Sequence, residues 1–299
     1  MTEPQQNDAR YFVAGTAFTA PPLAPGLHVV ATPIGNLKDI TIRALETLAA
    51  ADLVLCEDTR TSARLLDHYG IKARRQALHE HNERARIGEI LGRIRNGGAI
   101  ALISDAGTPL LSDPGFPLLR AIAEEGLPVF AIPGPSALLS ALVVAGLPTD
   151  AFSFHGFLPV KAGARANALA QLADSRETLV FYESPRRLAV TLSAMAETLG
   201  PDRPAAVALE LTKRFERVQR GSLAELAQVF AEGETKGEAV ILVGGAPEPA
   251  AASEEDWQAA LAEALAGQPL RAAVDDVSAR YGLKRKLVYD AALALKAER

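Results

Sequence analysis

Short, uniformly apolar runs alternate with segments of helical spacing in the first half of the chain. The apolar runs predict four strands, at Leu27–Ala31, Leu53–Cys56, Ala99–Ile103 and Val129–Ile132. Between the runs, apolar residues recur every three or four positions, which predicts helices. Strands that are apolar on both faces and separated by helices are typical of a parallel sheet with helices on both sides. We therefore expect an α/β domain over residues 27–146. Residues 137–145 are almost wholly apolar, which predicts a buried helix beginning after Ser136.

The second half has a similar pattern. Three apolar runs predict strands at Thr178–Tyr182, Ala205–Leu209 and Ala239–Val243. Ser184 followed by Pro185 has the form of a helix start, and Ser222 with Glu225 forms a capping box. These features predict a second, smaller α/β domain over residues 147–246.

Both ends of the chain differ in composition from the middle. The first 26 residues are polar and then rich in Ala and Pro, without a basic start and an apolar block, which predicts a disordered leader rather than a signal peptide. Residues 246–253 have the composition of a linker. The tail, residues 254–299, is helical throughout, with a break at Gly282 that predicts a small helix-turn-helix-like domain.

Composition narrows the class of protein. With 299 residues and 48% hydrophobic residues, the chain can build two packed cores. Its single cysteine, Cys56, excludes an internal disulfide and a Cys-rich zinc site, which fits a reducing compartment, and we expect a cytoplasmic protein. No apolar stretch reaches the roughly 18 residues of a membrane span, and none is predicted.

The net charge of −5 argues against a nucleic-acid partner, but the basic residues are clustered. Three clusters stand out: Arg60 to Arg75, Arg84 to Arg95, and Lys213 to Arg220. Lys284 and Arg285 also lie at the start of the last predicted helix, where an external anion would be favoured. Solvated helix faces, and a helical cap packed on the main body, are the plain alternatives for these features.

Four loops rich in Gly, Pro and small polar residues follow predicted strands. They are Thr32–Leu37, Ser104–Gly115, Pro133–Ala137 and Tyr182–Arg187. Open parallel sheets bind ligands beyond the carboxyl ends of their strands, so we expect these loops to form one ligand site. Two phosphate-binding fingerprints, G-x-G-x-x-G and G-x-x-x-x-G-K-[ST], are missing from the sequence.

Other polar segments are open to both structural and chemical interpretations. Glu57 to Ser62 follows a predicted strand with two carboxylates, an arginine and three hydroxyls; a capped helix start is the alternative. His79 and His81 lack the spacing of a zinc helix, and we predict no metal site.

Taken in order, six motifs resemble those of the tetrapyrrole methylase superfamily. The resemblance extends over residues 26–245 and includes Ala31–Leu37, Glu57–Arg60, Ser104–Gly115, Pro133–Ala137, Tyr182–Arg186 and Glu210–Lys213. Within the superfamily the chain resembles the branch that methylates the 2′-hydroxyl of a cytidine in the decoding region of 16S ribosomal RNA. The first loop has Thr-Pro-Ile-Gly-Asn where tetrapyrrole-acting members are Gly-rich, which favours the RNA branch.

The resemblance implies two α/β domains with S-adenosylmethionine in the cleft between them, a small C-terminal helical domain, and a homodimer. It also implies the residues that contact the cofactor: Pro33, Asp105, Gly107, Ser136, Ala137, Tyr182, Leu211 and Ala239.

Transfer of a methyl group from a sulfonium to a hydroxyl is an in-line displacement in which orientation contributes about 7–11 kcal/mol. A ribose hydroxyl is a weak nucleophile, so a base should assist. The hypothesised catalytic residues are Glu57 or Asp58 as the base, with Arg60 or Lys213 stabilising developing negative charge.

For 16S ribosomal RNA or the small ribosomal subunit as the partner, we expect phosphate contacts and binding that weakens steeply with salt. The predicted RNA-binding residues are Arg64, Arg186, Arg187, Arg214, Lys284 and Arg285. Aromatic residues make up only 5% of the chain, so extensive base stacking is not expected.

Three rival functions stay open at this point. One is methylation of a tetrapyrrole or another small substrate. Another is a phosphoribosyltransferase, because Glu57-Asp58 followed by hydroxyl residues loosely resembles an acidic ribose-binding loop, although Arg60 and the lack of glycine there oppose it. The last is a non-catalytic RNA-binding assembly factor that reads RNA with its C-terminal helices.

Overall fold

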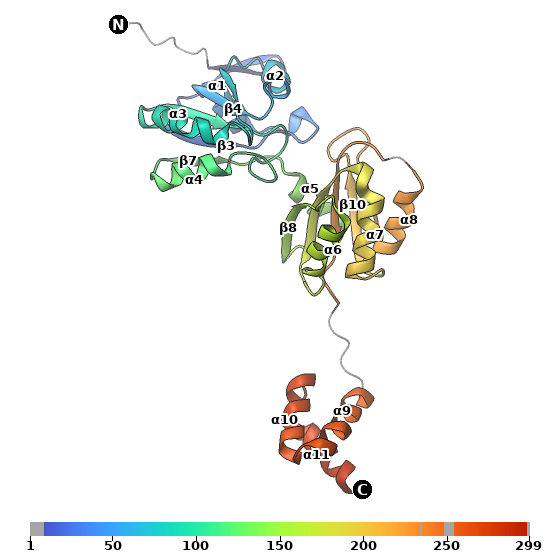
Figure 1. Cartoon of the computed structure of the whole chain (residues 1–299). Helices are drawn as coiled ribbons and strands as arrows, with labels where there is room; N and C mark the ends of the chain where they lie inside the picture. The colour runs from blue at the N-terminus through green and yellow to red at the C-terminus, as the bar shows by residue number, and fades with distance from the viewer. Residues whose placement is uncertain (1–8, 234, 248–253, 298–299) are drawn as a thin grey trace, which may run out of the picture. The chain divides into compact units, whose positions relative to one another are not determined.

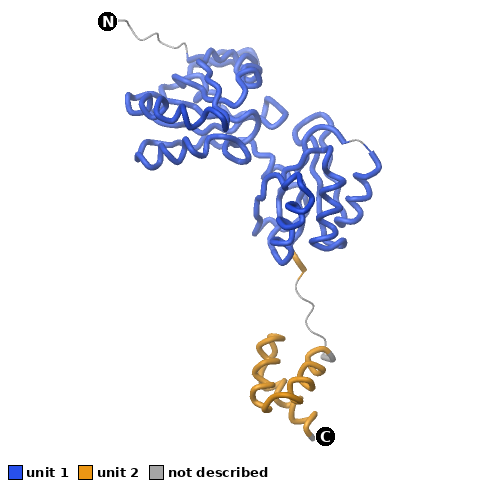
Figure 2. The backbone as a smooth tube through the Cα atoms, viewed as in Figure 1, with its two compact units in different colours: residues 1–245 blue, residues 246–299 orange. Residues whose placement is uncertain are grey.

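The computed structural model describes residues 9–233, 235–247 and 254–297 (Figure 1). The backbone divides into two compact units, residues 1–245 and 246–299 (Figure 2). The first unit contains two five-stranded sheets, and the second contains only helices.

The first sheet is wholly parallel, as the apolar runs predict. Its strands, in spatial order, are β5 (Arg75–Ala77), β4 (Leu53–Cys56), β6 (Ala99–Leu102), β3 (Gly26–Val30) and β7 (Val129–Ile132). Helices α1 (Ile42–Ala50) and α2 (Thr59–His68) bury their apolar sides with one face of the sheet. Helices α3 (Glu83–Arg95) and α4 (Phe116–Glu124) bury theirs with the other. The loops after β3, β6 and β7 therefore meet at one edge.

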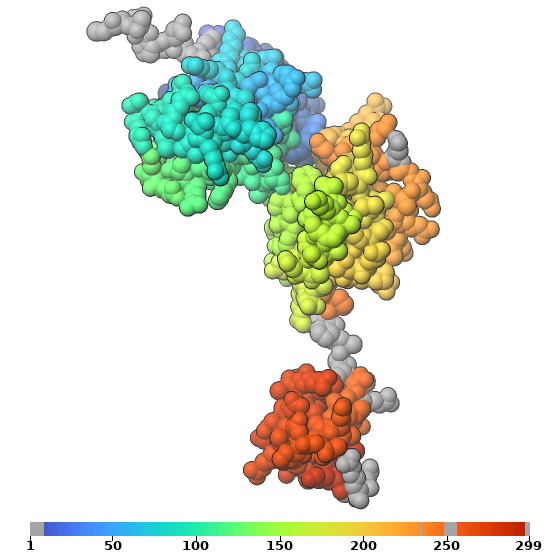
Figure 3. Space-filling model, in the orientation of Figure 1, coloured from blue at the N-terminus to red at the C-terminus, as the bar shows by residue number. Residues whose placement is uncertain are grey.

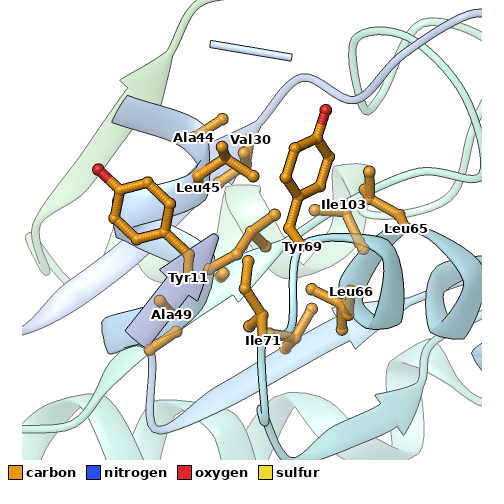
Figure 4. Close-up of a cluster of buried hydrophobic side chains, with 14 of the residues drawn as sticks. Tyr11, Val30, Ala44, Leu45, Ala49, Leu65, Leu66, Tyr69, Ile71 and Ile103 are labelled. Carbon is orange, nitrogen blue, oxygen red and sulfur yellow. The ribbon is translucent and has the colours of Figure 1, made fainter. Parts of the chain in front are cut away.

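The prediction of a disordered leader is wrong for the residues that the structure describes. β1 (Arg10–Val13) and β2 (Thr16–Thr19) pair as an antiparallel hairpin, and residues 1–8 lie outside the described part of the chain. Tyr11 is only 3% exposed and packs in the cluster that contains Leu45 and Ala49 of α1 (Figure 4). A local reading of the composition missed the hairpin, because the surface that covers Tyr11 comes from later segments.

The second sheet is mixed rather than a copy of the first. Its strands, in spatial order, are β11 (Arg217–Ser222), β10 (Pro204–Leu209), β12 (Ala239–Val243), β9 (Thr178–Glu183) and β8 (Phe152–Phe157). β8 and β9 are parallel, whereas the pairs β9–β12, β12–β10 and β10–β11 are antiparallel. The short connection between β10 and β11 requires that pair to be antiparallel, because a parallel crossover needs a dozen or more residues.

Helices cover both faces of the second sheet. On one face lie α6 (Ala162–Ala170), α7 (Leu188–Leu199) and α8 (Leu223–Ala231). The predicted capping box of Ser222 and Glu225 opens α8, and a short 3-10 turn at Pro185–Arg187 precedes α7. A 3-10 turn also occupies Leu37–Asp39 in the first half.

Helix α5 (Ala137–Ala145) begins after Ser136 as predicted, and it belongs by packing to the second sheet. Leu138, Ala141 and Leu142 share a core cluster with strand residues of β9, β10 and β12. The boundary predicted at residue 146 therefore follows a helix that already packs on the second sheet. The prediction of a buried helix is correct for one side only, because Leu139 is 50% and Val143 75% exposed on the other.

The C-terminal unit is a compact body of its own (Figure 3). It consists of α9 (Glu254–Gly267), α10 (Leu270–Tyr281) and α11 (Arg285–Ala297). Its core includes Trp257, Leu261, Val274 and Val288. Gly282 adopts the left-handed conformation that ends α10, with φ of +63°, which explains the break predicted there. In the described part of the chain, every helix is too short or too polar to cross a bilayer.

Candidate functional site

A cavity of about 430 Å³ lies where loops of both sheets meet. From the first half it is lined by Ile34, Asp105, Gly107, Thr108, Leu111, Asp113 and Ala137, among others. From the second half it is lined by Phe157, Tyr182, Glu183, Leu211, Gly237 and Ala239, among others. Strand register explains the second set, because Ala239 of β12 pairs with both Glu183 of β9 and Leu209 of β10.

Hydrogen bonds join the loop after β3 to the loop after β6. The backbones of Thr32 and Gly107 exchange two hydrogen bonds, of 2.8 and 2.9 Å. The Thr32 hydroxyl also donates to the Ser104 carbonyl at 3.2 Å. Gly107 has a φ of +79°, which favours glycine. Because glycine has no side chain, a ligand in the cavity can approach the backbone of this wall closely.

Two leucines that line the cavity, one from each sheet's loops, are each flanked by residues with left-handed backbone conformation. Leu110 and Ser112 have φ of +76° and +69° around Leu111, and Glu210 and Thr212 have φ of +50° and +64° around Leu211. Such conformations cost on the order of 1–3 kcal/mol for residues other than glycine and concentrate at functional sites. Since Leu111 and Leu211 both line the cavity, the strain falls on its two walls.

Carboxylates gather at the first-sheet side. Burial and then the charge of Glu57 raise the pKa of the Asp113 carboxyl to about 6, although a hydrogen bond from Ser104 opposes the shift. Burial, followed by the charge of Asp105, raises the pKa of Glu57. Asp113 and Asp105 line the cavity, whereas Glu57 does not. Asp113 belongs to a motif that the sequence analysis quoted, but no catalytic role was predicted for it.

Asp58 and Arg60 neutralise each other outside the cavity. Arg60 donates from Nη2 to Asp58 Oδ2 at 2.8 Å, and Asp58 also accepts the Arg60 backbone N–H as the N-cap of α2. The hydrogen bonds from Arg60 lower the pKa of Asp58 to about 2, so this carboxylate is a weak base. The hypothesised roles of Asp58 as proton acceptor and Arg60 as charge stabiliser thus lack geometric support, and the capped-helix alternative describes this segment.

Lys213 lies beside the cavity, paired with two carboxylates. Its Nζ is 2.9 Å from Glu210 Oε1 and 3.1 Å from Glu238 Oε2. Glu210 also accepts the backbone N–H of Glu238 at 2.9 Å, so these contacts join the loop after β10 to the residues before β12. This geometry favours a structural role for Lys213, in which it holds the two loops together. The predicted role was to stabilise negative charge at the reacting oxygen.

Glu183 is the most enclosed acidic residue of the cavity wall, and its role was not predicted. It is 3% exposed and accepts hydrogen bonds from the Thr191 hydroxyl at 2.6 Å and the Ser184 N–H at 2.7 Å. Arg187 completes the arrangement, with Nη2 3.3 Å from Glu183 and 2.8 Å from the Leu158 carbonyl oxygen. These contacts hold Arg187 within the fold, and its RNA contact stays a prediction.

The structure brings six of the eight predicted cofactor residues together in the cavity wall. These are Asp105, Gly107, Ala137, Tyr182, Leu211 and Ala239. Pro33 and Ser136 are adjacent in sequence to lining residues but do not line the cavity themselves. Ser136 accepts the Leu139 N–H as the N-cap of α5. Gly237, which no sequence pattern indicated, has a φ of +96°, and the Glu210 carboxylate fills the space that a side chain would need there.

The remaining predicted RNA contacts are surface residues. Arg64, Arg186, Arg214, Lys284 and Arg285 are all exposed. Arg285 forms an ion pair with Asp275 at 2.6 Å. Among the residues that the structure describes, no group of three or more His, Cys, Asp or Glu side chains could hold a metal ion. His79 and His81 lie with ring centroids 5.9 Å apart.

Two family models match the chain. The model described as tetrapyrrole (corrin/porphyrin) methylases matches residues 26–227, and the model described as the RsmI C-terminal HTH domain matches residues 251–296. Among curated proteins, the chain is similar to ribosomal RNA small subunit methyltransferase I of Mesorhizobium japonicum. That match has 50% identity over 95% of this chain and 97% of the relative. The protein of the same name from Haemophilus influenzae is 44% identical over 90% and 96%.

The fold is similar to that of solved structures. One is uroporphyrin-III C-methyltransferase from Thermus thermophilus, which was solved in complex with S-adenosyl homocysteine. It aligns with a TM-score of 0.52 and 19% identity over 73% of this chain and 97% of that chain. At this identity the likeness shows a shared fold.

Proposed function

Because this chain belongs to the tetrapyrrole methylase family, we propose that it transfers a methyl group from S-adenosylmethionine to RNA of the small ribosomal subunit. The proposed acceptor is the ribose 2′-hydroxyl of a cytidine in the decoding region. Two relatives named ribosomal RNA small subunit methyltransferase I align with this chain over nearly their whole length, which supports an RNA substrate. The single observation that carries the site is the cavity shared by the two sheets, lined by six residues that the family motifs indicated.

The cavity suits the methyl donor in size and chemistry. Its volume of about 430 Å³ is within the range of small-molecule sites, roughly 300–1,000 Å³. Ile34, Leu111 and Leu211 offer apolar walls, and Gly107 and Gly237 permit close approach to backbone. When bound, S-adenosylmethionine supplies a methyl group activated by a sulfonium. Asp105 and Asp113 provide negative charge that favours such a cation.

We assign proton removal to Asp113 in place of Glu57 or Asp58. Asp113 lines the cavity, and a carboxyl with a pKa of about 6 is largely ionised at neutral pH while more basic than an ordinary aspartate. In the step, the hydroxyl oxygen bonds to the methyl carbon as the carbon–sulfur bond breaks with its electrons going to sulfur. The Asp113 carboxylate takes the hydroxyl proton and later releases it to solvent.

We propose that the exposed cations bind the phosphates of the RNA. Arg64, Arg186 and Arg214 belong to the first unit, and Lys284 and Arg285 to the helical unit. Since each phosphate neutralised releases counterions, RNA binding should weaken steeply with salt. The proposed location is the cytoplasm, where the proposed RNA substrate would be met.

We also propose a homodimer that buries the exposed side of α5. Leu139 and Val143 are one helical turn apart on that side, and both are half or more exposed. β7 is an edge strand of the first sheet and has Val129 38% exposed. Exposed apolar side chains and an open sheet edge each favour association over solvation.

The test combines donor binding with acceptor mapping. Calorimetry should detect one S-adenosylmethionine per chain. Labelled donor should then transfer its methyl group to small subunits or their RNA and not to tetrapyrroles, and digestion with mass spectrometry should locate the label on a cytidine ribose. Label on a tetrapyrrole would favour the small-substrate alternative. RNA binding without donor uptake would favour a non-catalytic assembly factor.

A further inference from the structure

The loop between β10 and β11 presents an aromatic side chain to solvent. Phe215 is 73% exposed, whereas the strand that precedes it, β10, is buried along most of its length. A single exposed apolar residue is common on protein surfaces and is not by itself a site. Its surroundings distinguish this one.

Hydrogen bonds within the loop fix the backbone around Phe215. The Thr212 N–H donates to Glu216 Oε2 at 2.5 Å, and the Glu216 N–H donates to the Lys213 carbonyl at 3.1 Å. The Lys213 N–H in turn donates to the Glu210 carbonyl at 3.0 Å. Because these bonds lie on both sides of the aromatic residue, its exposed position is pre-organised, which lowers the entropy that a ligand must remove on binding.

One cation lies against the Phe215 ring, and two more line the same hollow. The Arg214 guanidinium carbon lies 5.6 Å from the ring centroid, and Arg217 and Lys236 line the same hollow of about 580 Å³. Two carboxylates also line the hollow: Glu210, which pairs with Lys213, and Glu216, which accepts the Thr212 N–H. Within the described ranges, no ion pair joins Arg214, Arg217 or Lys236 to a carboxylate. With three cations against two carboxylates in its lining, the hollow combines an aromatic face with an excess of positive charge.

The hollow and the donor cavity are built from the same two loops. In the first loop, Glu210 lines the hollow and its neighbour Leu211 lines the cavity. In the second loop, Lys236 lines the hollow and its neighbour Gly237 lines the cavity. A ligand lying across the hollow would therefore reach the rim of the proposed methyl-transfer site.

We propose that Phe215 is the stacking platform for an unpaired base of the RNA substrate, with Arg214 and Arg217 on the adjoining phosphates. An aromatic face beside guanidinium groups matches single-stranded RNA, whose bases are splayed and stack on aromatic or arginine planes. Duplex RNA keeps its bases stacked on one another and offers none to Phe215. This inference rests on the proposed function, and it assigns one base contact rather than extensive stacking.

The experiment measures binding of a fluorescein-labelled RNA hairpin with a single-stranded loop, and of a blunt duplex of equal length, by anisotropy. We expect Phe215→Ala and Phe215→Leu to weaken hairpin binding by about 5- to 100-fold, and Phe215→Tyr to retain it, because stacking needs a planar ring. Duplex binding and S-adenosylmethionine affinity should stay within about twofold of the wild type. The matched control is Phe116→Ala, which removes another exposed phenylalanine (63%) at the start of α4.

A second readout reports stacking directly. In Phe215→Trp, hairpin RNA should quench the new tryptophan, whereas in Phe116→Trp it should not; Trp257, buried in the helical unit, contributes the same background to both.

Several results would overturn the inference. They are unchanged hairpin affinity in Phe215→Ala, wild-type affinity in Phe215→Leu, or an equal loss for hairpin and duplex. Loss on assembled small subunits but not on RNA alone would mean that Phe215 contacts a protein. Failure of the proposed function has a different signature: the wild type would take up no donor and transfer no methyl group, while anisotropy would still show whether Phe215 stacks on RNA.

Discussion

Gly35, in the loop after β3 of the first sheet, packs directly against the side chain of Lys213, in the loop after β10 of the second sheet. A Cβ atom on Gly35 would lie 2.5 Å from Cγ and 2.9 Å from Cε of Lys213. Since Nζ of Lys213 is held by Glu210 and Glu238, the lysine cannot simply swing away. The contact therefore couples the first-sheet loop to the wall that carries Leu211 and Gly237.

Gly35→Ala should lower kcat/KM for methyl transfer by roughly 10- to 100-fold, because displacing Lys213 misplaces the wall beside the donor. The double variant with Lys213→Ala should lose less than the two single losses combined, with a coupling of about 0.5–3 kcal/mol. Gly88→Ala is the control, since an added Cβ in that exposed part of α3 meets nothing within 4 Å. Additive effects at Gly35 and Lys213 would show that the two residues act separately.

Asp113→Asn should reduce kcat by about 10²- to 10⁴-fold if Asp113 removes the acceptor proton. The wild-type rate should rise with pH through about 6 and level off above it, because the ionised carboxylate is the active form. Single-turnover assays from pH 5 to pH 8 check both points. Asp67→Asn, on the exposed side of α2, is the charge-matched control. An unchanged rate and pH profile in Asp113→Asn would remove Asp113 from the mechanism.

The same residue makes a prediction about stability. The folded-state pKa of Asp113, about 6, is above the unfolded value of about 3.9, so the folded protein binds the proton more tightly. Ionisation therefore destabilises the fold as pH rises from about 4 to about 6, and the cost is fully present above that range. Urea unfolding should show Asp113→Asn to be more stable than wild type at pH 8, with the difference vanishing near pH 4.

Arg203→Met should destabilise the first unit by about 3 kcal/mol or more. Arg203 is 4% exposed, and its guanidinium donates to the carbonyls of Gly244 and Ser175, each at 2.7 Å, and of Ala173 at 2.8 Å. Methionine fills similar volume but leaves these acceptors unpaired. The urea midpoint measures the loss, and Arg84→Met, at an exposed position of α3, should change it little.

Tyr11→Ala should cost about 3 kcal/mol, because the buried ring packs with α1. The variant should also make residues 10–19 more sensitive to protease, since the hairpin depends on this contact. Phe12 donates its N–H to the Tyr69 carbonyl at 2.9 Å, which is a second attachment of the same strand. Unfolding curves and limited proteolysis test both, and wild-type stability in Tyr11→Ala would mean that the hairpin contributes nothing to the core.

Val143→Glu should shift the proposed dimer to monomer in sedimentation velocity, because it places a charge on the exposed side of α5. Val160→Glu provides a close control, since both valines are 75% exposed and Val160 lies before α6. Far-ultraviolet circular dichroism should be unchanged for both variants. A monomeric wild type would disprove the proposed dimer outright.

Local pattern was sufficient to predict much of the fold. The apolar runs at Leu53–Cys56 and Ala99–Leu102 became central strands, and Ser136 and Ser222 cap the helices that follow them. These features depend on residues within a few positions of one another. β11 was missed because its residues are largely polar and none is buried at this sheet edge, so no apolar alternation marks it.

Motif order likewise indicated which loops form the site, and six predicted residues do share one cavity. Sequence could not show that Arg60 turns back onto Asp58, that Arg187 points inward to Glu183, or that Gly35 meets Lys213. Backbone periodicity and capping are set by neighbours along the chain, whereas the partner of a charged side chain is set by where separate loops come to lie. The sequence by itself determined the strands, the caps and the site-forming loops. Only the packing of the two sheets decided which of their carboxylates and cations face the cavity.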